Sequence, residues 1–211
     1  MPEHVNPRRP YRSERRREQA EETRERVLAA AAVLFAERGF ERATIAAIAA
    51  EAGVSPETVY AGFRNKRTLL GELIRTAVRG GNASPVLQQA GPRAVAAATD
   101  QQEQVRLFAA DISLRLERAA PLVGVVSAAS HAEPELATLL AKLHAERFEN
   151  LRMFVQALAA NGPLRLEPEA ALETVWALAS PDLHQLLTCT RGWTRDRYCD
   201  WLAGSLARLL L

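Results

Sequence analysis

The sequence predicts an all-α protein, and three observations carry that prediction. Ala, Leu, Arg and Glu dominate the 211 residues, and all four are good helix formers. Apolar residues recur at helical spacing along most of the chain, whereas β-branched runs with a period of two are absent. Pro and Gly fall between these periodic segments, where they begin and end helices. Hydrophobic residues at 48% and charged residues at 25% are typical of a folded globular protein.

Four helices are predicted in the N-terminal third, each bounded by residues that begin or end helices. The first begins at Glu22 and ends at Gly39, because glycine suits the position after a helix end. Thr44 and Ser55 are expected to cap the next two, since their side-chain oxygens accept hydrogen bonds from first-turn amides. Gly53 separates those two helices. The predicted ranges are 22–38, 45–52, 56–63 and 66–78.

A larger helical bundle is predicted behind residues 80–100, a Gly- and Pro-containing segment expected to have little regular structure. Thr99 and Gln102 match a capping box at the start of the first bundle helix. Proline opens most of the later helices, because its fixed φ suits the first helical turn. The predicted ranges are about 99–119, 121–130, 134–160, 168–179, 182–191 and 195–211.

The chain therefore divides into a flexible basic arm (1–20), a unit of three short helices (21–66) and a larger helical unit (67–211). A connecting helix is expected to join the two helical units. The arm contains the run RRPYRSERRR, in which six arginines accompany only Glu14. Net charge is only +2, so the whole chain is not a general polyanion binder. Such a run is usually a solvated arm, and it becomes a DNA-binding arm only beside a DNA-reading unit.

The stretch IAAEAGVSPETVYAGF, residues 48–63, matches a helix-turn-helix, in which two short helices meet at a glycine-containing turn. Ile48 and Ala49 give the first helix an apolar face, and Val59 and Phe63 give one to the second. Tyr60 cannot share the buried side of so short a helix with them. The spacing alone leaves two interpretations: a DNA-reading helix, or a helical hairpin within a larger bundle.

The exposed positions of the second helix suit contacts with DNA. Ser55, Glu57 and Thr58 lie at its start, where they can reach base edges, and Glu57 can accept from cytosine N4. Tyr60 can donate its hydroxyl to a phosphate. Lys66, at the start of the following helix, adds a positive charge for a second phosphate.

The run from Thr23 to Leu70 resembles the DNA-binding module of the tetracycline-repressor (TetR) family of bacterial regulators. The shared features are AA..LF.E.GF, the threonine before the second helix, IA..AGVS and T.Y..F..K..L, at unbroken spacing. The resemblance implies that Thr44 and Tyr60 contact phosphates, that Lys66 contacts the DNA backbone, and that residues 55–61 enter the major groove. The implied DNA-binding residues are Thr44, Ser55, Pro56, Glu57, Thr58, Tyr60, Ala61, Arg64 and Lys66.

This chain departs from the family pattern at two places in the second helix. Pro56 and Glu57 stand where the family often has a basic residue and a glycine, and Ala61 and Gly62 stand where it often has an aromatic residue and a histidine. Several usual DNA contacts are therefore missing. Arg64 and the arginine arm are candidates to supply affinity in their place.

The resemblance also implies a homodimer that reads a palindromic DNA operator, because one recognition helix contacts few bases and two half-sites lie about 34–36 Å apart. The last two long helices are expected to form the dimer contact, and the bundle is expected to hold an unidentified small-molecule effector rather than a cofactor. The predicted dimer residues are Leu183, Leu186, Leu187, Tyr198, Trp201, Leu202, Leu206 and Leu209. The predicted pocket residues are Phe108, Ile112, His144, Arg147, Phe148, Leu151 and Trp176.

Other classes of protein receive little support from the sequence. It contains no constellation typical of an enzyme, no metal-ligand spacing and no apolar run long enough to span a membrane. Cys189 and Cys199 do not form a disulfide framework, so a cytoplasmic protein is expected, with two inert thiols favoured over a redox pair. The leading prediction is a ligand-responsive transcriptional regulator, most often a repressor. The alternative is a helix-turn-helix interaction protein with weak or no specific DNA reading.

Overall fold

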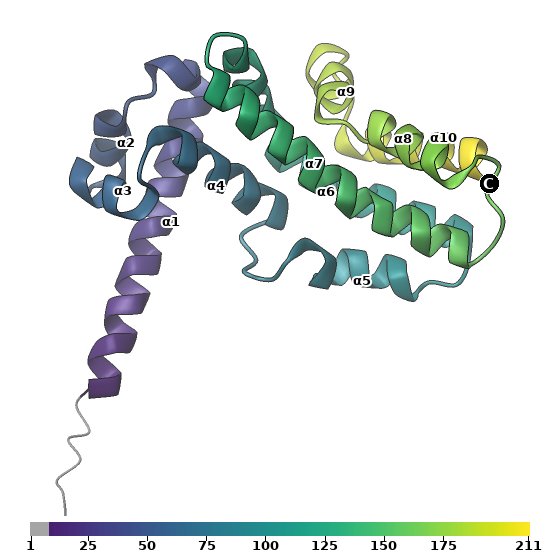
Figure 1. Cartoon of the computed structure of the whole chain (residues 1–211), viewed down its shortest axis with the longest axis horizontal. Coiled ribbons are helices and arrows are strands. Elements are labelled where there is room, and N and C mark those ends of the chain that lie inside the picture. The colour runs from purple at the N-terminus through teal and green to yellow at the C-terminus, as the bar shows by residue number, and fades with distance from the viewer. Residues whose placement is uncertain (1–8) are drawn as a thin grey trace, which may run out of the picture. The chain divides into compact units, whose positions relative to one another are not determined.

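The computed structural model describes residues 9–211, with side chains described from residue 15, and every regular element in that range is a helix (Figure 1). The predicted all-α fold, with an N-terminal helix-turn-helix and a C-terminal helical domain, is confirmed. The chain forms two compact units, and the division falls between Leu73 and Ile74, inside a helix, rather than at the predicted residue 67.

The N-terminal unit contains α1 (Arg9–Arg42), α2 (Ile45–Ala52), α3 (Pro56–Phe63) and the first part of α4 (Lys66–Arg79). Helix α1 begins well before the predicted Glu22, so residues 9–20 of the predicted flexible arm are helical; residues 1–8 lie outside the described residues. Gly39 has φ 71° and ψ −179°, which breaks the helical conformation where the sequence predicted an end.

The core of this unit is built from the apolar faces that the helical spacing predicted. Phe35 and Phe40 stack with ring centroids 6.0 Å apart, and Arg24 lies 4.6 Å above the Phe63 ring while it pairs with Glu72 at 3.1 Å. Each large apolar side chain buried in this way stabilises the fold by about 1.5–3 kcal/mol. The buried set includes Val27, Leu28, Ala31, Leu34, Phe35, Ile48, Val59, Phe63, Leu69 and Leu70.

The C-terminal unit is a bundle around the long helix α6, which packs against four other helices of the unit: α5, α7, α9 and α10. Helices α6 and α7 lie side by side in Figure 1. The elements are η1 (Val86–Gln88), α5 (Ala90–Ala97), α6 (Gln101–Ser130), α7 (Pro134–Ala160), α8 (Pro168–Leu178), α9 (Pro181–Gln185), the π-helical η2 (Leu186–Thr190) and α10 (Arg195–Leu210).

Three sequence predictions in this unit are wrong. The segment 80–100, expected to be irregular, contains η1 and α5. Helix α5 is attached to α6 because Val95 is buried and its carbonyl accepts a hydrogen bond from the buried Gln104 side chain at 3.1 Å. The helices expected at 99–119 and 121–130 are one, α6, with Pro121 inside it. Proline removes one backbone donor, but the apolar neighbours on both sides are buried and keep the helix continuous. Asp100, not Thr99, caps α6 by accepting from Glu103 N at 2.8 Å.

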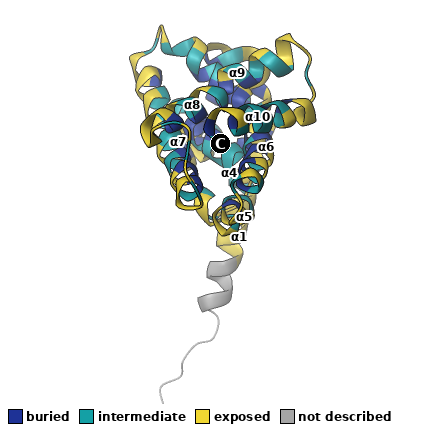
Figure 2. Cartoon of the chain, turned by 90° about the vertical axis from the view of Figure 1, so that its right-hand side faces the viewer, coloured by how far each residue is buried: buried dark blue, intermediate teal, exposed yellow. Residues whose placement is uncertain are grey.

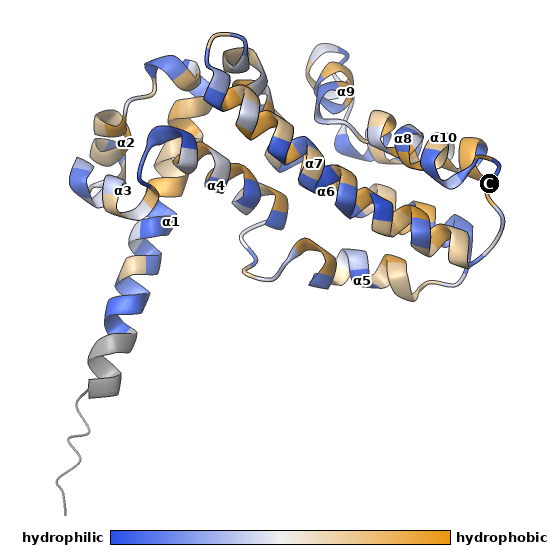
Figure 3. Cartoon of the chain, in the orientation of Figure 1, coloured by the Kyte–Doolittle hydropathy of each residue, from blue (hydrophilic) through white to orange (hydrophobic). Residues whose placement is uncertain are grey.

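The bundle core lies where the apolar faces of α6, α7, α8 and α10 meet. Figure 2 shows buried residues on these inward faces, and in Figure 3 hydrophobic and hydrophilic positions alternate along α6 and α7 as an amphipathic helix requires. Phe108 of α6 stacks on Phe154 of α7 with ring centroids 3.9 Å apart. Over the described part of the chain, no helix combines the length and the apolar character needed to cross a membrane.

Candidate DNA-binding surface and ligand cavity

The turn between α2 and α3 has the geometry that the sequence predicted. Thr44 Oγ1 accepts from Ala47 N at 3.1 Å to begin α2, and Gly53 ends it with φ 66° and ψ 39°, a left-handed conformation that suits glycine. Ser55 Oγ accepts from Thr58 N at 3.3 Å to begin α3. These caps fix the start of α3 at Pro56, three residues after Gly53.

Helix α3 exposes the residues that were expected to meet DNA. Val59 and Phe63 are buried against the rest of the unit, whereas Ser55, Thr58 and Tyr60 are exposed, and Tyr60 retains 52% of its surface. No hydrogen-bond partner for the Tyr60 hydroxyl is found among the described residues, so it is available to a phosphate. Of the other residues assigned to this surface, Thr44, Ala61 and Arg64 are exposed and Pro56 is half-buried.

Glu57 gives the start of α3 a negative charge. Hydrogen bonds with its own backbone and with the Ser55 side chain lower the pKa of Glu57, so the carboxylate stays ionised at neutral pH. An ionised carboxylate repels phosphate and can accept a hydrogen bond from cytosine N4. Glu57 therefore favours a base contact over a backbone contact on this surface.

Arg64 ends α3 in an unusual backbone conformation. Its φ is 61°, the only positive value at a non-glycine residue in the described part of the chain, and its N–H bonds the Tyr60 carbonyl at 2.8 Å. A positive φ at a residue with a β-carbon costs on the order of 1 kcal/mol or more. The turn places the exposed Arg64 side chain beside the end of α3.

Lys66 makes contacts within the N-terminal unit that were not predicted beside its expected DNA-backbone contact. Its ammonium donates to the carbonyl of Phe40 at 2.6 Å and to that of Glu41 at 3.3 Å, and it lies 4.1 Å above the Phe40 ring. These carbonyls belong to the last turn of α1, where backbone acceptors have no helical partner. Lys66 therefore joins the start of α4 to the end of α1, a role that the sequence motif did not reveal.

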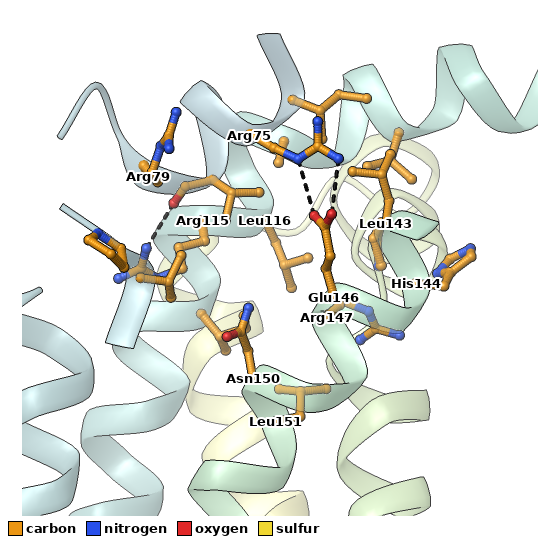
Figure 4. Close-up of a pocket in the computed structure, with 18 residues that line it drawn as sticks. Arg75, Arg79, Arg115, Leu116, Leu143, His144, Glu146, Arg147, Asn150 and Leu151 are labelled. Atoms are coloured by element: carbon orange, nitrogen blue, oxygen red, sulfur yellow. Dashed lines mark hydrogen bonds and ion pairs between the residues drawn. The ribbon is translucent and has the colours of Figure 1, made fainter. Parts of the chain in front are cut away.

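Two adjacent cavities lie in the C-terminal unit. The first, of about 270 Å³, is bounded by residues of α4, η1, α6, α7 and α9, and the second, of about 410 Å³, by residues of η1, α5, α6 and α7. Five residues line both cavities, so the cavities have part of their wall in common: Val86, Ile112, Arg115, Asn150 and Leu151. Figure 4 shows the first cavity, with Asn150 among the labelled side chains that line it.

Five of the seven predicted pocket residues line these cavities. Ile112 and Leu151 line both, His144 and Arg147 line the first, and Phe108 lines the second. Phe148 and Trp176 line neither, because both pack against the bundle core. The two are contacted instead by arginines: Arg152 lies 5.2 Å above the Phe148 ring, and Arg147 lies 4.7 Å above that of Trp176.

Apart from Arg147, the charged residues of the first cavity were not predicted from the sequence. Arg75 of α4 makes two hydrogen bonds with Glu146 of α7, at 3.0 and 3.2 Å (Figure 4). These residues are 71 positions apart, so local spacing could not pair them. Asp111 and Arg115, by contrast, lie four positions apart on α6, which is a recognisable sequence signal for their ion pair.

Arg115 is the most deeply buried charged residue of the described chain, with 5% of its surface exposed. Asp111 accepts two bonds from it at 2.6 and 2.9 Å, and its Nη1 donates to Val78 O at 2.8 Å and to Gln89 Oε1 at 3.0 Å. The neighbouring Arg118 donates to Ala77 O at 2.9 Å. Helix α6 thus supplies donors to the last carbonyls of α4.

Arg147 is a half-buried cation with incomplete hydrogen bonding. Its Nη1 donates to the carbonyls of Trp176 and Ala179 at 3.0 and 3.1 Å, while Nε and Nη2 are buried without a partner. Burial lowers the pKa of Arg147 to about 10, so it remains charged at neutral pH. Burial first, and then the Arg147 charge, also lower the pKa of His144, which leaves that ring neutral.

The predicted dimer residues divide into two groups. Tyr198, Leu202 and Leu206 are completely buried in the bundle core, so their assignment to a dimer contact is wrong. Leu183, Leu187 and Trp201 are partly exposed, and Leu186 and Leu209 keep 52% and 46% of their surface. The spacing of apolar residues in the sequence could not distinguish the buried from the exposed group, because both faces of α10 carry apolar residues.

The remaining chemistry of the described residues is limited. Cys189 is an exposed free thiol and Cys199 a half-buried one, and burial raises the pKa of Cys199, which disfavours its reactive thiolate. Within residues 15–211, no three side chains of the His, Cys, Asp and Glu types are grouped so that they could hold a metal ion.

Comparison with known proteins supports the helix-turn-helix. Residues 27–73 match the family described as bacterial regulatory proteins, tetR family, which confirms the resemblance seen in the sequence. No curated protein matches the chain.

Several solved structures share the fold. A putative TetR-family transcriptional regulator from Rhodococcus sp. is 20% identical over 90% of this chain and 100% of its own, with a TM-score of 0.69. A putative transcriptional regulator from Saccharomonospora viridis, solved with choline, is 23% identical over 90% and 98%, with a TM-score of 0.65. NalD, the secondary repressor of the MexAB-OprM multidrug efflux pump in Pseudomonas aeruginosa, is 21% identical over 92% and 98%, with a TM-score of 0.64.

Proposed function

We propose that this chain, whose residues 27–73 match the bacterial tetR family, is a ligand-responsive transcriptional regulator that binds a palindromic operator as a homodimer. The observation that carries the proposal is the exposure of Ser55, Thr58 and Tyr60 on a helix whose opposite side is buried. A short helix held in this way can enter a major groove with its first turn against base edges. A bacterial regulator of this kind acts in the cytoplasm, where its DNA is.

Release by a small organic molecule is the second part of the proposal. The first cavity lies beside the last turn of α4, whose carbonyls accept hydrogen bonds from Arg115 and Arg118. Helix α4 begins in the N-terminal unit and ends in the C-terminal unit. A ligand that moves the last turn of α4 would therefore also move the first turn of this helix, which belongs to the N-terminal unit. A ligand regulates only by its different affinities for two such states.

Repression is the output that we favour. One structural neighbour, NalD, is named as a repressor, and another was solved with a small molecule, choline. A repressor of this kind occupies its operator without ligand and leaves it when the ligand binds.

The test is the binding of labelled duplexes that tile the promoter region next to the chain's own gene, followed by fluorescence anisotropy. We expect one palindromic duplex to bind well above the others, two chains per duplex. Tyr60→Phe removes only an exposed hydroxyl, so it should weaken binding about tenfold if that hydroxyl donates to a phosphate. The matched control is Tyr198→Phe, which removes a buried hydroxyl bonded to Leu178 O and should leave DNA affinity unchanged.

Equal, weak binding of all duplexes, with no effect of Tyr60→Phe, contradicts the proposal. That result favours the alternative of a helix-turn-helix interaction protein without specific DNA reading, for which the charge of Glu57 on α3 is the supporting observation.

A further inference from the structure

The two cavities of the C-terminal unit share part of their wall but differ in the charged residues that line them. They share five lining residues, among them Asn150 and Arg115, and the first cavity is the smaller at about 270 Å³ against about 410 Å³. A ligand that occupies both would lie against the shared wall, which includes Asn150 and Arg115.

The second cavity suits an apolar group. Its wall contains Phe108, Phe154 and Val95 from the core, and the exposed side chains of Leu87 and Met153 contribute to it from η1 and α7. Its charged residues, Asp111 and Arg115, already neutralise each other through two hydrogen bonds. Little in this wall would attract a charged group.

The first cavity carries an excess of positive charge. Arg75, Arg79, Arg115 and Arg147 line it, against a single carboxylate, Glu146. Arg75 is neutralised by Glu146 and Arg115 by Asp111. Arg79 and Arg147 form no ion pair with any carboxylate of the described chain, and Asp182 acts on Arg147 only through its more distant charge.

The same two arginines have unused hydrogen-bonding capacity. Arg79 Nε and Arg147 Nε and Nη2 are buried and have no partner. Buried N–H groups of native proteins are nearly always bonded, so a missing partner often marks the place of a ligand or an ion. Asn150, on the wall common to both cavities, also has no hydrogen-bond partner among the described residues, and its amide can donate to an oxygen.

We propose that this site binds an amphipathic organic anion, with a carboxylate or comparable singly charged head group in the first cavity, near Arg79, Arg147 and Asn150, and an apolar body in the second. The inference rests on the proposed ligand-responsive function and names its ligand class. A cation would meet two arginines that form no ion pair, and a neutral apolar molecule would leave their unbonded N–H groups without an acceptor.

The test compares three probes of equal chain length on the full chain by isothermal titration calorimetry: octanoate, octan-1-ol and octyltrimethylammonium. We expect octanoate to bind at least tenfold more tightly than octan-1-ol and the cation to bind most weakly. Equal affinities for octanoate and octan-1-ol, preference for the cation, or no binding of any probe would each overturn the inference.

Variants of Arg79 show whether the arginine charge sets the preference. Arg79→Met should lower the ratio of octanoate to octan-1-ol affinity several-fold without changing octan-1-ol binding, and Arg79→Lys should retain the ratio. Arg106→Met is the matched control, because Arg106 is an exposed arginine of α6 that pairs with Glu103 and lines neither cavity. An unchanged ratio in Arg79→Met contradicts the assignment.

Operator binding without any probe separates this inference from the proposed function. If a palindromic duplex binds but the probes show no preference for the anion, the ligand class is wrong and the DNA-binding function stands. If no duplex binds specifically while octanoate binds with the expected preference, the regulator is wrong and the anion site stands.

Discussion

Arg75 of α4 and Glu146 of α7 form an ion pair with two hydrogen bonds, Nη2 to Oε1 at 3.0 Å and Nε to Oε2 at 3.2 Å. The pair lies at the first cavity (Figure 4) and links the part of α4 that belongs to the bundle to α7. Both side chains remain partly exposed, at 29% and 41%, so water screens their attraction.

Reversal of either charge in this pair should destabilise the protein, and reversal of both should restore most of the loss. Arg75→Glu and Glu146→Arg each place like charges together, and we expect each to lower the free energy of unfolding by about 1 kcal/mol at low salt. Urea unfolding of the four proteins in a double-mutant cycle measures the coupling. Additive losses in the double variant would show that the pair contributes nothing.

Loss of the Lys66 ammonium should destabilise the N-terminal unit. Lys66→Met leaves the carbonyl of Phe40 without its charged donor, and we expect the free energy of unfolding to fall by about 1–3 kcal/mol. Lys142→Met, at an exposed position of α7, is the matched control and should be neutral. If Lys66→Met unfolds like the unaltered chain and only its DNA affinity falls, the originally predicted phosphate contact is its main role.

A charge at the exposed leucines of the last helices should separate the proposed dimer. Leu186→Glu and Leu209→Glu put a carboxylate on surface that is already exposed, so folding should persist while the chain becomes monomeric in sedimentation equilibrium. Val33→Glu makes the same change on exposed α1 and should leave the oligomeric state unaltered. If the chain remains dimeric with both leucine changes, the dimer contact lies elsewhere on the molecule.

His184 should make the protein less stable in mild acid. Its ring is 5% exposed, packs against Tyr198, and has no partner for either nitrogen; burial lowers the pKa of His184, which Glu117 opposes only in part. As the pH falls, His184 therefore takes up a proton in the unfolded chain before it does so in the folded chain. The stability of the fold is at its full value above about pH 6.5 and decreases as the pH falls from there toward the lower pKa of His184 in the folded chain.

His184→Leu should reduce this loss of stability between pH 7 and pH 5, as followed by thermal unfolding. At pH 7 it should be neutral or raise the free energy of unfolding by about 1 kcal/mol, because it removes two unpartnered buried nitrogens. His131→Gln, at an exposed position, serves as the control. An identical pH profile for His184→Leu would mean that another group carries the acid sensitivity.

Gly91 and Gly62 should respond in opposite directions to alanine. A methyl group at Gly91 would overlap the Asp111 carboxylate that holds Arg115, so Gly91→Ala should lower the free energy of unfolding by about 1–3 kcal/mol. A methyl group at Gly62, inside α3, meets nothing, and Gly62→Ala should raise the free energy of unfolding by about 0.5–1 kcal/mol. Chemical unfolding of both variants checks the pair; equal effects would contradict the packing at Gly91.

Local signals predicted the helix-turn-helix well because its geometry depends on neighbouring residues. Thr44 and Ser55 cap through amides three positions away, and Gly53 acts through its own backbone. The same locality limited the prediction elsewhere. Helix α5 is held by Gln104, whose amide also donates to Ala157 O at 3.3 Å across the bundle, and no spacing rule shows that contact.

The sequence by itself determined the helical class, which positions of α3 are buried and which are exposed, and most helix ends. Helix propensity, apolar periodicity and capping act over a few residues, so the sequence shows them directly. Only the tertiary structure decided which apolar face of α10 is core and which is surface, that Lys66 bonds the end of α1, and that four arginines from three helices surround one cavity. Those outcomes depend on which helices pack together, and helix packing joins residues that the chain keeps far apart.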